Sequence, residues 1–528
     1  MAENIKIIAD QRPDEAALID EQGETTWREL NGNVNRLIRA LRDAGLGTGS
    51  TVGILMSNRR EYFEVLAACA HASMTAVPIN WHCVAEEVEY VLDNSDAEAL
   101  LTDDRFVELA AQASSGLDRL RMRVVVGKAN NAASGQGGFL GYEEVLANAD
   151  DDEPEDQGEG DVMFFTSGTT GRPKGVRRLS PPGGSLEQSR LRSMGFSALL
   201  GVPQARTTLL CGPLYHSAQW AFSYLPLGVG STVVMRHKFV SEEVLELIDR
   251  YRITSVHLVP TQFIRLLRVD DETRDAFDGS SLELVMHGAA PCPPGVKRRM
   301  IEWWGPVVAE YYGGTEGAVI SIIRSDEWLE RPGSVGKPLP IVEVTVIAED
   351  GRLADTGQPG QIYVRNQMAP DFKYHKEPGK TEEAHLGPGV FTMGDIGYLD
   401  EDGYLFLTDR KIDMIISGGV NIYPAEIEMT LGDHPAVRDV AVIGVPDEEY
   451  GEQVKAVVEL NDGFDPSETT VAELIAHCRK HLAGYKAPKT IDFDATLPRH
   501  PTGKLYKRLL RERYAASSRV EGADDEPS

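Results

Sequence analysis

The stretch DVMFFTSGTTGRPKG, residues 161–175, runs from apolar side chains directly into a segment rich in glycine and hydroxyl groups. The apolar run at 162–165 predicts a buried strand, and a strand that ends in a glycine-rich turn is a common ligand site of open α/β sheets. Glycines allow close backbone approach, and successive amides with Ser and Thr hydroxyls can form an anion-binding concavity. The stretch therefore predicts an α/β sheet with a phosphate-binding loop.

Two other interpretations of this loop fit the sequence less well. A Walker-type loop is excluded, because Pro173 stands where that motif needs glycine and Lys174 is followed by Gly175 rather than Ser or Thr. A Gly/Ser/Thr-rich linker has a similar composition. The strand that leads into the loop argues against a linker.

Composition limits the possible partners. A chain of 528 residues with 42% hydrophobic residues can form several packing units, and the formal charge of −29 disfavours nucleic acid and anionic membranes. The five cysteines are odd in number and lack a CxxC pair, so neither a zinc site nor a disulfide framework is indicated. No signal segment or apolar run long enough for a membrane span is visible. We expect a soluble, cytoplasmic protein.

The apolar pattern changes along the chain. Strand-like and helix-like segments alternate up to about residue 291, as in a parallel sheet covered by helices. Turn signals then recur over 333–409 and predict an antiparallel, barrel-like β subdomain, after which a smaller α+β pattern follows. We expect an α/β fold with an N-terminal domain at 1–409, a C-terminal α+β domain at 410–515 and an acidic, disordered tail at 516–528.

Six separated motifs occur in an order and spacing that resemble the adenylate-forming superfamily. They are TSGTTGRPKG (166–175), HGAAP (287–291), YYGGTE (311–316), TMGDIGYLDEDGYL (392–405), DRKIDMIISGGVNIYPAEIE (409–428) and PTGKLYKR (501–508). The resemblance covers nearly the whole chain and is greatest to stand-alone acyl-CoA synthetases, the fatty-acid or aryl-CoA ligases. It implies a large N-terminal adenylation domain and a small, mobile C-terminal domain.

The resemblance implies an ATP-dependent acid–thiol ligase, an AMP-forming acyl-CoA synthetase. Such an enzyme activates a fatty, cyclic or aryl acid to an acyl-adenylate and then to its CoA thioester, with ATP, Mg²⁺ and CoA. The residues that match the family's ATP-binding positions are Thr166, Ser167, Gly168, Thr169, Thr170, Lys174, Gly288, Ala289, Ala290, Tyr312, Asp395 and Arg410.

The same resemblance implies four catalytic residues: Lys504, Glu316, Thr315 and His216. Lys504 would bridge the attacking carboxylate and the α-phosphate, a role that suits a compact ammonium on a flexible stem. Glu316, with Thr170, would hold Mg²⁺, a hard cation that takes oxygen ligands. From the residues alone, Glu316 could equally be a solvated turn carboxylate and His216 a hydrogen-bonded core histidine.

Further matches concern the acid and the thiol. His216, Trp220, Gln262, Gly313 and Gly314 would line the acid pocket, with His216 between this pocket and the thiol tunnel. The two small glycines are expected to leave room for a bulky, cyclic or extended acid. Gly418 and Gly419 would line the CoA tunnel.

The sequence departs from the family pattern in two places. Ile412 occupies the hinge position, where Asp or Lys is common, and VRRLSPPGG follows the phosphate loop. The acceptor is left open between CoA and another nucleophile, as in an amide synthetase or a carrier-protein loading enzyme. A non-catalytic relative is disfavoured because Glu316, Asp395 and Lys504 are all present. The oligomeric state also stays open, with a homodimer as one alternative.

Overall fold

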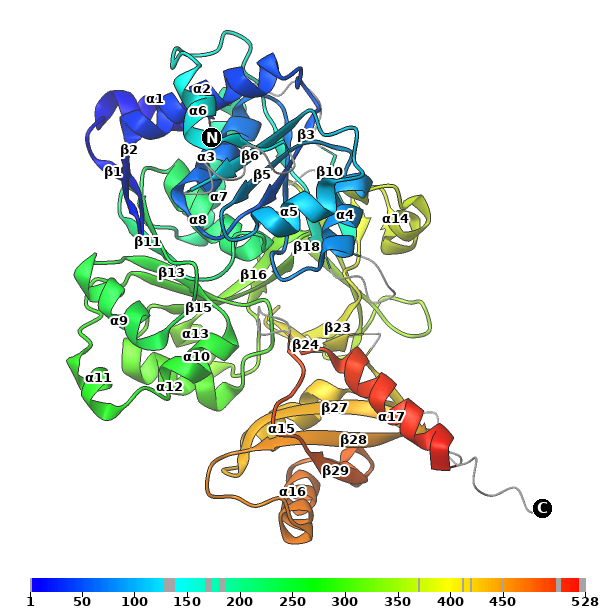
Figure 1. Cartoon of the computed structure of the whole chain (residues 1–528). Helices are drawn as coiled ribbons and strands as arrows, with labels where there is room; N and C mark the ends of the chain where they lie inside the picture. The colour runs from blue at the N-terminus through cyan, green and yellow to red at the C-terminus, as the bar shows by residue number, and fades with distance from the viewer. Residues whose placement is uncertain are drawn as a thin grey trace.

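The computed structural model describes residues 2–127, 138–166, 173–179, 186–368, 371–410, 413–417, 420–447, 450–499 and 505–521. In Figure 1 the blue-to-yellow elements form one large part, and the orange and red elements form a smaller part below it. The large part contains two parallel or mixed sheets and two antiparallel sheets, and the small part contains one mixed sheet.

The first sheet has six parallel strands in the order β7-β6-β5-β3-β4-β8. Its strands are β3 (Thr51–Leu55), β4 (Thr75–Pro78), β5 (Ala97–Asp103), β6 (Met122–Val126), β7 (Leu140–Gly141) and β8 (Asp161–Val162). Apolar side chains of β3 are buried on both faces, as expected when helices cover a parallel sheet on either side. One face packs on α2 (Trp27–Asp43), α3 (Arg60–His71) and α6 (Tyr142–Ala147), and the other on α4 (Ala85–Asn94) and α5 (Val107–Ser114).

The second sheet has nine strands in the order β17-β16-β15-β14-β13-β11-β12-β1-β2, with a parallel centre and antiparallel edges. Its strands are β1 (Ala16–Asp20), β2 (Gly23–Thr26), β11 (Thr207–Leu210), β12 (Thr232–Met235), β13 (Ser255–Leu258), β14 (Leu284–His287), β15 (Val308–Gly314), β16 (Ala318–Arg324) and β17 (Lys337–Pro338). The helices of this region are α1 (Ala2–Gln11), α7 (Leu186–Leu200), α8 (Ser217–Gly228), α9 (Ser241–Arg250), α10 (Pro260–Leu266), α11 (Asp271–Ala276), α12 (Pro294–Trp304) and α13 (Ser325–Glu330).

The large part also contains two antiparallel sheets, of which the six-stranded one lies in the region predicted to be poor in helices. The three-stranded sheet has the order β20-β10-β9, from β9 (Phe164–Thr166), β10 (Lys174–Arg178) and β20 (Phe372–Tyr374). The six-stranded sheet has the order β21-β22-β19-β23-β24, with β18 paired to β19. It contains β18 (Val342–Ile347), β19 (Gly360–Asn366), β21 (His385–Gly387), β22 (Val390–Phe391), β23 (Asp395–Leu399) and β24 (Leu405–Arg410), and α14 (Pro378–Ala384) precedes β21.

The small part is built on a five-stranded sheet with the order β26-β25-β28-β27 and β29 paired to β28. Its elements are β25 (Ile415–Ser417), β26 (Val420–Ile422), α15 (Pro424–Gly432), β27 (Val437–Asp447), β28 (Gly451–Leu460), α16 (Glu468–His481), η2 (Gly484–Lys486), β29 (Thr490–Phe493) and α17 (Lys507–Glu521). Helix α17 continues to Glu521, so the segment expected as a tail begins inside this helix.

The predicted strand at 162–165 is divided between two sheets. Asp161–Val162 pairs in parallel with β4, whereas Phe164–Thr166 pairs antiparallel with β10. Met163, between them, still donates its backbone N–H to Ala76 of β4. The chain therefore leaves the parallel sheet just before the phosphate loop, because β10 on the far side of that loop offers a second set of backbone partners.

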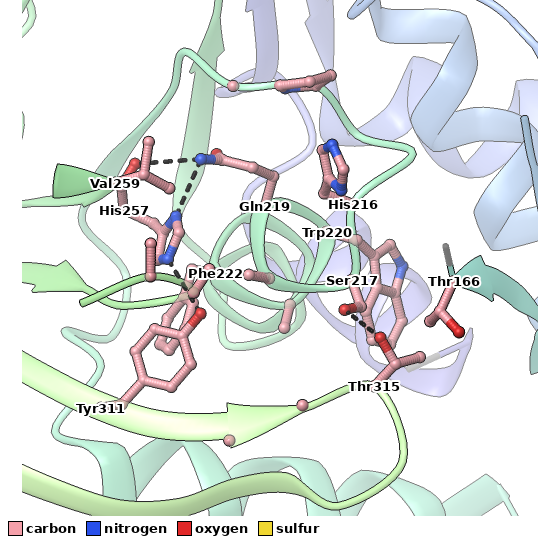
Figure 2. A pocket seen from close by; sticks show the side chains of 18 of the residues that line it. Thr166, His216, Ser217, Gln219, Trp220, Phe222, His257, Val259, Tyr311 and Thr315 are labelled. Carbon is pink, nitrogen blue, oxygen red and sulfur yellow. Dashed lines mark hydrogen bonds between the residues drawn. The ribbon is translucent and has the colours of Figure 1, made fainter. Parts of the chain in front are cut away.

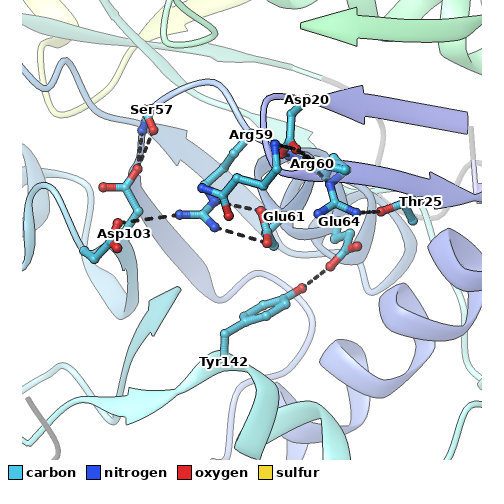
Figure 3. Close-up of polar contacts among 12 residues, drawn as sticks. Asp20, Thr25, Ser57, Arg59, Arg60, Glu61, Glu64, Asp103 and Tyr142 are labelled. Carbon is cyan, nitrogen blue, oxygen red and sulfur yellow. Dashed lines mark hydrogen bonds and ion pairs between the residues drawn. The ribbon is translucent and has the colours of Figure 1, made fainter. Parts of the chain in front are cut away.

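A buried polar network lies where α3 meets α6 and β1 (Figure 3). Glu64 accepts hydrogen bonds from the Tyr142 hydroxyl at 2.5 Å and from the Asn33 amide at 3.0 Å. Burial raises the pKa of Glu64 to about 7, although both hydrogen bonds act in the opposite direction. Nearby, Arg60 forms an ion pair with Asp20 at 3.1 Å. Glu64 is thus a carboxyl that can gain or lose its proton near neutral pH.

Within the described ranges, no helix is both long enough and apolar enough to cross a bilayer. The same residues contain no group of three or more His, Cys, Asp or Glu side chains that could hold a metal ion. All five cysteines are free thiols.

Candidate active site

A cavity of about 2640 Å³ opens where several strands of the two large sheets end. Residues that follow β4, β11, β13 and β14 line it, namely Asn80, Gly212, Val259 and Ala289. The carboxyl ends of parallel strands meet at one edge of a sheet, which is the usual ligand site of such folds. Side chains of the small part, including Tyr506, also line this cavity.

The phosphate loop connects two paired strands. Thr166 ends β9 and Lys174 begins β10, and the two residues are direct partners across the hairpin. Thr166 lines the cavity. The predicted ligands between them, Ser167, Gly168, Thr169 and Thr170, lie outside the described residues. The structure therefore defines both ends of the loop.

Lys174 and Glu316 share one neighbour, Tyr374 of β20. The Lys174 ammonium lies 5.0 Å from the centroid of the Tyr374 ring, and the Tyr374 hydroxyl donates to Glu316 Oε1 at 3.0 Å. Burial and the positive charge of Lys380 lower the pKa of Lys174, while Glu377 and Glu316 oppose this shift. Tyr374 was not predicted, because its segment DFKYHKE carries no recognisable ligand motif.

The turn after β15 brings Thr315 to helix α8. The hydroxyls of Thr315 and Ser217 lie 2.9 Å apart and form a hydrogen bond (Figure 2). A side chain on Gly313 would meet the Ala318 carbonyl oxygen at 2.0 Å, and one on Gly314 would meet Met393 Sδ at 2.6 Å. Both glycines line the cavity, but the protein itself fills the space beside them. Backbone thus occupies the space beside Gly313, whereas the flexible Met393 side chain occupies the space beside Gly314, so the room that they leave for a bulky acid stays a prediction.

Asp395 and Tyr312 form a buried pair on the cavity wall. The Tyr312 hydroxyl donates to Asp395 Oδ2 at 2.7 Å, and each residue is at most 8% exposed. Arg410 is the β24 partner of Asp395 in the antiparallel ladder, so its backbone lies directly opposite, although its side chain is not described. The structure thus brings the three predicted nucleotide residues together.

The segment after β14 has little space for side chains. A Cβ on Gly288 would lie 2.5 Å from Tyr311 Cε1, so only glycine fits there. Ala289 has a φ of 66°, a left-handed conformation that L-residues rarely adopt. Ala289 and Ala290 line the cavity. These observations agree with a flat wall for a planar group.

The acid pocket predicted beside His216 has aromatic walls. His216 precedes the first turn of α8. The Trp220 ring packs edge-on against the Phe164 ring, with 5.5 Å between the ring centroids, and stacks on the Tyr224 ring, with 5.6 Å between the centroids. Gln262 lies at the start of α10, where its Oε1 accepts the Val259 N–H at 2.8 Å. His216, Trp220 and Gln262 all line the cavity. The walls suit a flat, apolar group.

A hydrogen-bonded chain of Gln219, His257 and Tyr311 also lines this pocket and was missed by sequence reasoning (Figure 2). Gln219 Nε2 lies 2.9 Å from His257 Nδ1, and His257 Nε2 lies 3.3 Å from the Tyr311 hydroxyl. Burial lowers the pKa of His257 to about 3, so its ring is neutral. The three residues come from α8, β13 and β15, and no local motif connects them.

Several predicted residues of the small part lie outside the described ranges: Lys504, Gly418, Gly419 and Ile412. Leu505 and Tyr506, which directly follow Lys504 in the chain, line the cavity. Burial raises the pKa of Tyr506, and nearby Cys83 and Glu87 of the large part add to this shift. The residues that directly follow Lys504 in the chain therefore reach the cavity.

Taken together, a tyrosine–aspartate pair, the two ends of a glycine-rich loop and an aromatic pocket lie around one cavity, the arrangement expected of an enzyme that binds a nucleotide and a small molecule. Residues 6–369 match the family model described as AMP-binding enzyme, and residues 426–504 match its AMP-binding enzyme C-terminal domain. Because the first match spans more than half of the chain, the chain belongs to the AMP-binding enzyme family.

Among curated relatives, a feruloyl-CoA synthase of Amycolatopsis sp is 35% identical over 93% of this chain and 94% of its own. The long-chain-fatty-acid–CoA ligase FadD13 of Mycobacterium tuberculosis is 30% identical over 93% of both chains. Among solved structures, the anthranilate CoA ligase AuaEII in complex with anthranoyl-AMP has a TM-score of 0.86 and 26% identity, covering 98% of both chains. The amide bond synthetase McbA of Marinactinospora thermotolerans has a TM-score of 0.83 and 28% identity, covering 97% and 99%.

These matches confirm the predicted family and the α/β fold with a large N-terminal and a smaller C-terminal domain. They also confirm the predicted enzyme class, an AMP-forming acid–thiol ligase.

Proposed function

We propose that this chain activates an aromatic carboxylic acid with ATP and transfers the acyl group to the thiol of CoA. The observation that carries this proposal is the single cavity shared by the Tyr312–Asp395 pair, the Glu316 carboxylate and the aromatic pocket around Trp220. The feruloyl and anthranilate enzymes, both named for aromatic acids, support the choice of acid.

In the first step, an oxygen of the carboxylate bonds to the α-phosphorus of ATP, and pyrophosphate leaves with the electrons of the broken P–O bond. Tyr312 would stack on adenine beside the wall at 288–290, and Asp395, assisted by Arg410, would accept hydrogen bonds from the ribose. The loop at 166–174 would hold the β- and γ-phosphates, and Lys504 would bridge the two reactants. Such preorganised charges stabilise developing negative charge without a protein nucleophile.

The residues present fit Mg²⁺. This ion keeps several waters and usually takes one or two carboxylates together with substrate phosphates. Glu316 lines the cavity close to the phosphate loop, and Tyr374 fixes one of its oxygens at 3.0 Å. Glu316, with Thr170 of the loop, would hold the ion, which supplies positive charge to the phosphates when bound. Thr315 would contact the α-phosphate region from its position beside Ser217.

In the second step, the sulfur of CoA bonds to the acyl carbon, AMP leaves, and the thiol proton passes to solvent. Gly418 and Gly419 would line the route of the thiol, and His216 would separate that route from the acid pocket. The small domain is expected to rotate between the two steps, with Ile412 or a neighbour as hinge. Hinges absorb dihedral change and require no particular charge.

The domain boundaries, location and assembly belong to the same proposal. Two clusters of buried apolar residues in the small part draw all their members from 415–514, which supports a boundary near 409/410. Free cysteines fit the reducing cytoplasm, where we place the protein. We retain a homodimer as a prediction to be checked by light scattering.

One experiment tests the function directly. The purified protein is incubated with ATP, Mg²⁺ and a library of aromatic and fatty acids, with and without CoA, while pyrophosphate and thioester are measured. We expect acid-dependent pyrophosphate release with aromatic acids and thioester only when CoA is present. Release with unbranched fatty acids alone would contradict the aromatic assignment.

The likeness to an amide bond synthetase favours one second candidate, in which an amine replaces CoA. The variant Gly419→Leu separates the two. If CoA enters past Gly419, this variant should form the adenylate in a single turnover yet lose most thioester formation. If amide formation with added amines exceeds thioester formation in the wild-type protein, the second candidate is correct.

A further inference from the structure

The Gln219–His257–Tyr311 chain is built into the protein from two sides. A Cβ on Gly212 would lie 2.4 Å from Gln219 Cδ, so the glycine makes space for this amide. On the other side, the Phe222 ring stacks on the His257 ring, with 5.0 Å between the ring centroids and an interplanar angle of 7°. The centroids of the Phe222 and Tyr311 rings lie 5.1 Å apart. The three polar groups are therefore held in fixed positions.

The direction of each hydrogen bond in this chain follows from its partners. Gln219 Nε2 lies 3.5 Å from the His257 carbonyl oxygen, which can only accept, so the amide nitrogen faces His257. The amide therefore donates to His257 Nδ1, and the neutral ring carries its hydrogen on Nε2. That hydrogen is donated to the Tyr311 oxygen at 3.3 Å.

This direction leaves the hydroxyl hydrogen of Tyr311 for another acceptor. Among the described residues, no acceptor for it is present, since its one hydrogen bond is the one that it accepts from His257. Burial raises the pKa of the Tyr311 phenol, so the group stays protonated. Tyr311 is 7% exposed and lines the cavity, next to Phe222. A buried donor without an acceptor is costly, and an arriving ligand can remove that cost.

We propose that Tyr311 is a specificity-determining residue that donates a hydrogen bond to an acceptor oxygen, such as an ether or carbonyl oxygen, on the acid away from its carboxylate. The proposal rests on the proposed function, because it places the acid in this pocket. It narrows the substrate from any aromatic acid to one with an oxygen at the end that meets Tyr311. A site built to donate to such an oxygen discriminates strongly against an analogue that lacks it.

The test compares pairs of acids of equal shape. Cinnamic and benzoic acids with a methoxy group or the isosteric ethyl group, at each ring position in turn, are assayed by pyrophosphate release. For at least one ring position we expect the wild-type kcat/KM to be about ten-fold higher for the methoxy acid than for the ethyl acid. A factor of about ten corresponds to the free energy of one buried hydrogen bond. In Tyr311→Phe the ratio of the two kcat/KM values should fall to about one.

Two further variants separate the effect of the hydrogen-bond direction from a general effect of losing a polar group. Gln219→Met removes the donor that fixes the His257 tautomer, so the methoxy preference should weaken although Tyr311 is unchanged. Tyr404→Phe removes a phenol hydroxyl that donates to Glu327 at 3.0 Å and does not line the cavity, so the preference should persist. Circular dichroism confirms that each variant is folded.

The outcomes distinguish this inference from the proposed function. A wild-type ratio near one at every ring position, or a ratio that survives in Tyr311→Phe, overturns the role of Tyr311. If only fatty acids are activated, the aromatic assignment fails, and the same comparison is made with chains that carry an ether oxygen or a methylene at matched positions. A ten-fold preference for the chain with the ether oxygen over the chain with the methylene, lost in Tyr311→Phe, would still support Tyr311 as the hydrogen-bond donor.

Discussion

Tyr374 should couple the phosphate loop to Glu316, the carboxylate that we propose as a Mg²⁺ ligand, and two substitutions separate the contacts of Tyr374. Tyr374→Phe removes the hydroxyl that donates to Glu316 at 3.0 Å but keeps the ring 5.0 Å from the Lys174 ammonium. Tyr374→Leu removes both contacts. Glu316 is partly exposed, so we take the lower end of the range for a hydrogen bond to a charged group, about 1.5 kcal/mol. A cation–π contact at a partly exposed site adds about 0.5–1 kcal/mol.

These values predict that ATP binding weakens in Tyr374→Phe and weakens further in Tyr374→Leu. Tyr374→Phe should raise the Mg²⁺ concentration needed for half-maximal ATP binding about ten-fold, since a 1.4 kcal/mol change is ten-fold in an equilibrium constant. Tyr374→Leu should weaken ATP binding about two- to five-fold further, because Lys174 loses its support. Calorimetric titration of ATP at several Mg²⁺ concentrations measures both effects without turnover.

The control is Tyr398→Phe, whose ring stacks on Phe406 at 5.0 Å outside the cavity lining. It should bind ATP and Mg²⁺ as the wild type does. An unchanged Mg²⁺ dependence in Tyr374→Phe would refute the role of the hydroxyl. Equal affinities for ATP in Tyr374→Phe and Tyr374→Leu would refute the role of the Tyr374 ring.

Three further predictions concern charge in the catalytic and structural parts. Lys504→Ala should reduce pyrophosphate release about 10²–10³-fold with ATP affinity nearly unchanged, and near-normal release would contradict its assignment. Lys297→Met should lower the free energy of unfolding in urea by about 3–5 kcal/mol, because it removes the cation paired with the buried Glu310 carboxylate at 2.6 Å and leaves only the neutral His287 ring, 3.9 Å away; an unfolding midpoint equal to that of the wild type would show that Glu310 is compensated otherwise. For Glu64, burial raises the folded-state pKa from 4.5 to about 7, so the folded chain binds the proton more tightly and stability is lost as pH rises between these values. Glu64→Gln keeps the shape of the side chain without its charge. The melting temperature of this variant, relative to that of the wild type, should therefore be higher at pH 8 than at pH 5.5. The same difference in melting temperature at both pH values would count against the raised pKa of Glu64.

Much of the fold could be predicted from periodicity. The run at 50–58, which predicts a strand, contains β3, and the run at 60–74, which predicts a helix, contains α3, because a parallel sheet requires strands buried on both faces and helices that cover them. The change of sheet at Met163 could not be predicted, since it depends on β10 as a partner across the loop. The same holds for α17, whose last residues are polar and yet remain helical to Glu521.

What the sequence by itself determined is the family and the set of contiguous motifs, because the loop at 166–175 and the turn at 311–316 each keep their chemistry within a few neighbouring residues. Only the tertiary structure decided which residues from distant segments act on those motifs. Tyr374 reaches Glu316 across 58 positions, and His257 reaches Tyr311 across 54. Such contacts are set by how strands pair and helices pack, and a side chain 50 residues away leaves no periodic or local trace in the sequence. Packing also placed the Ala318 backbone beside Gly313, where a side chain would meet it.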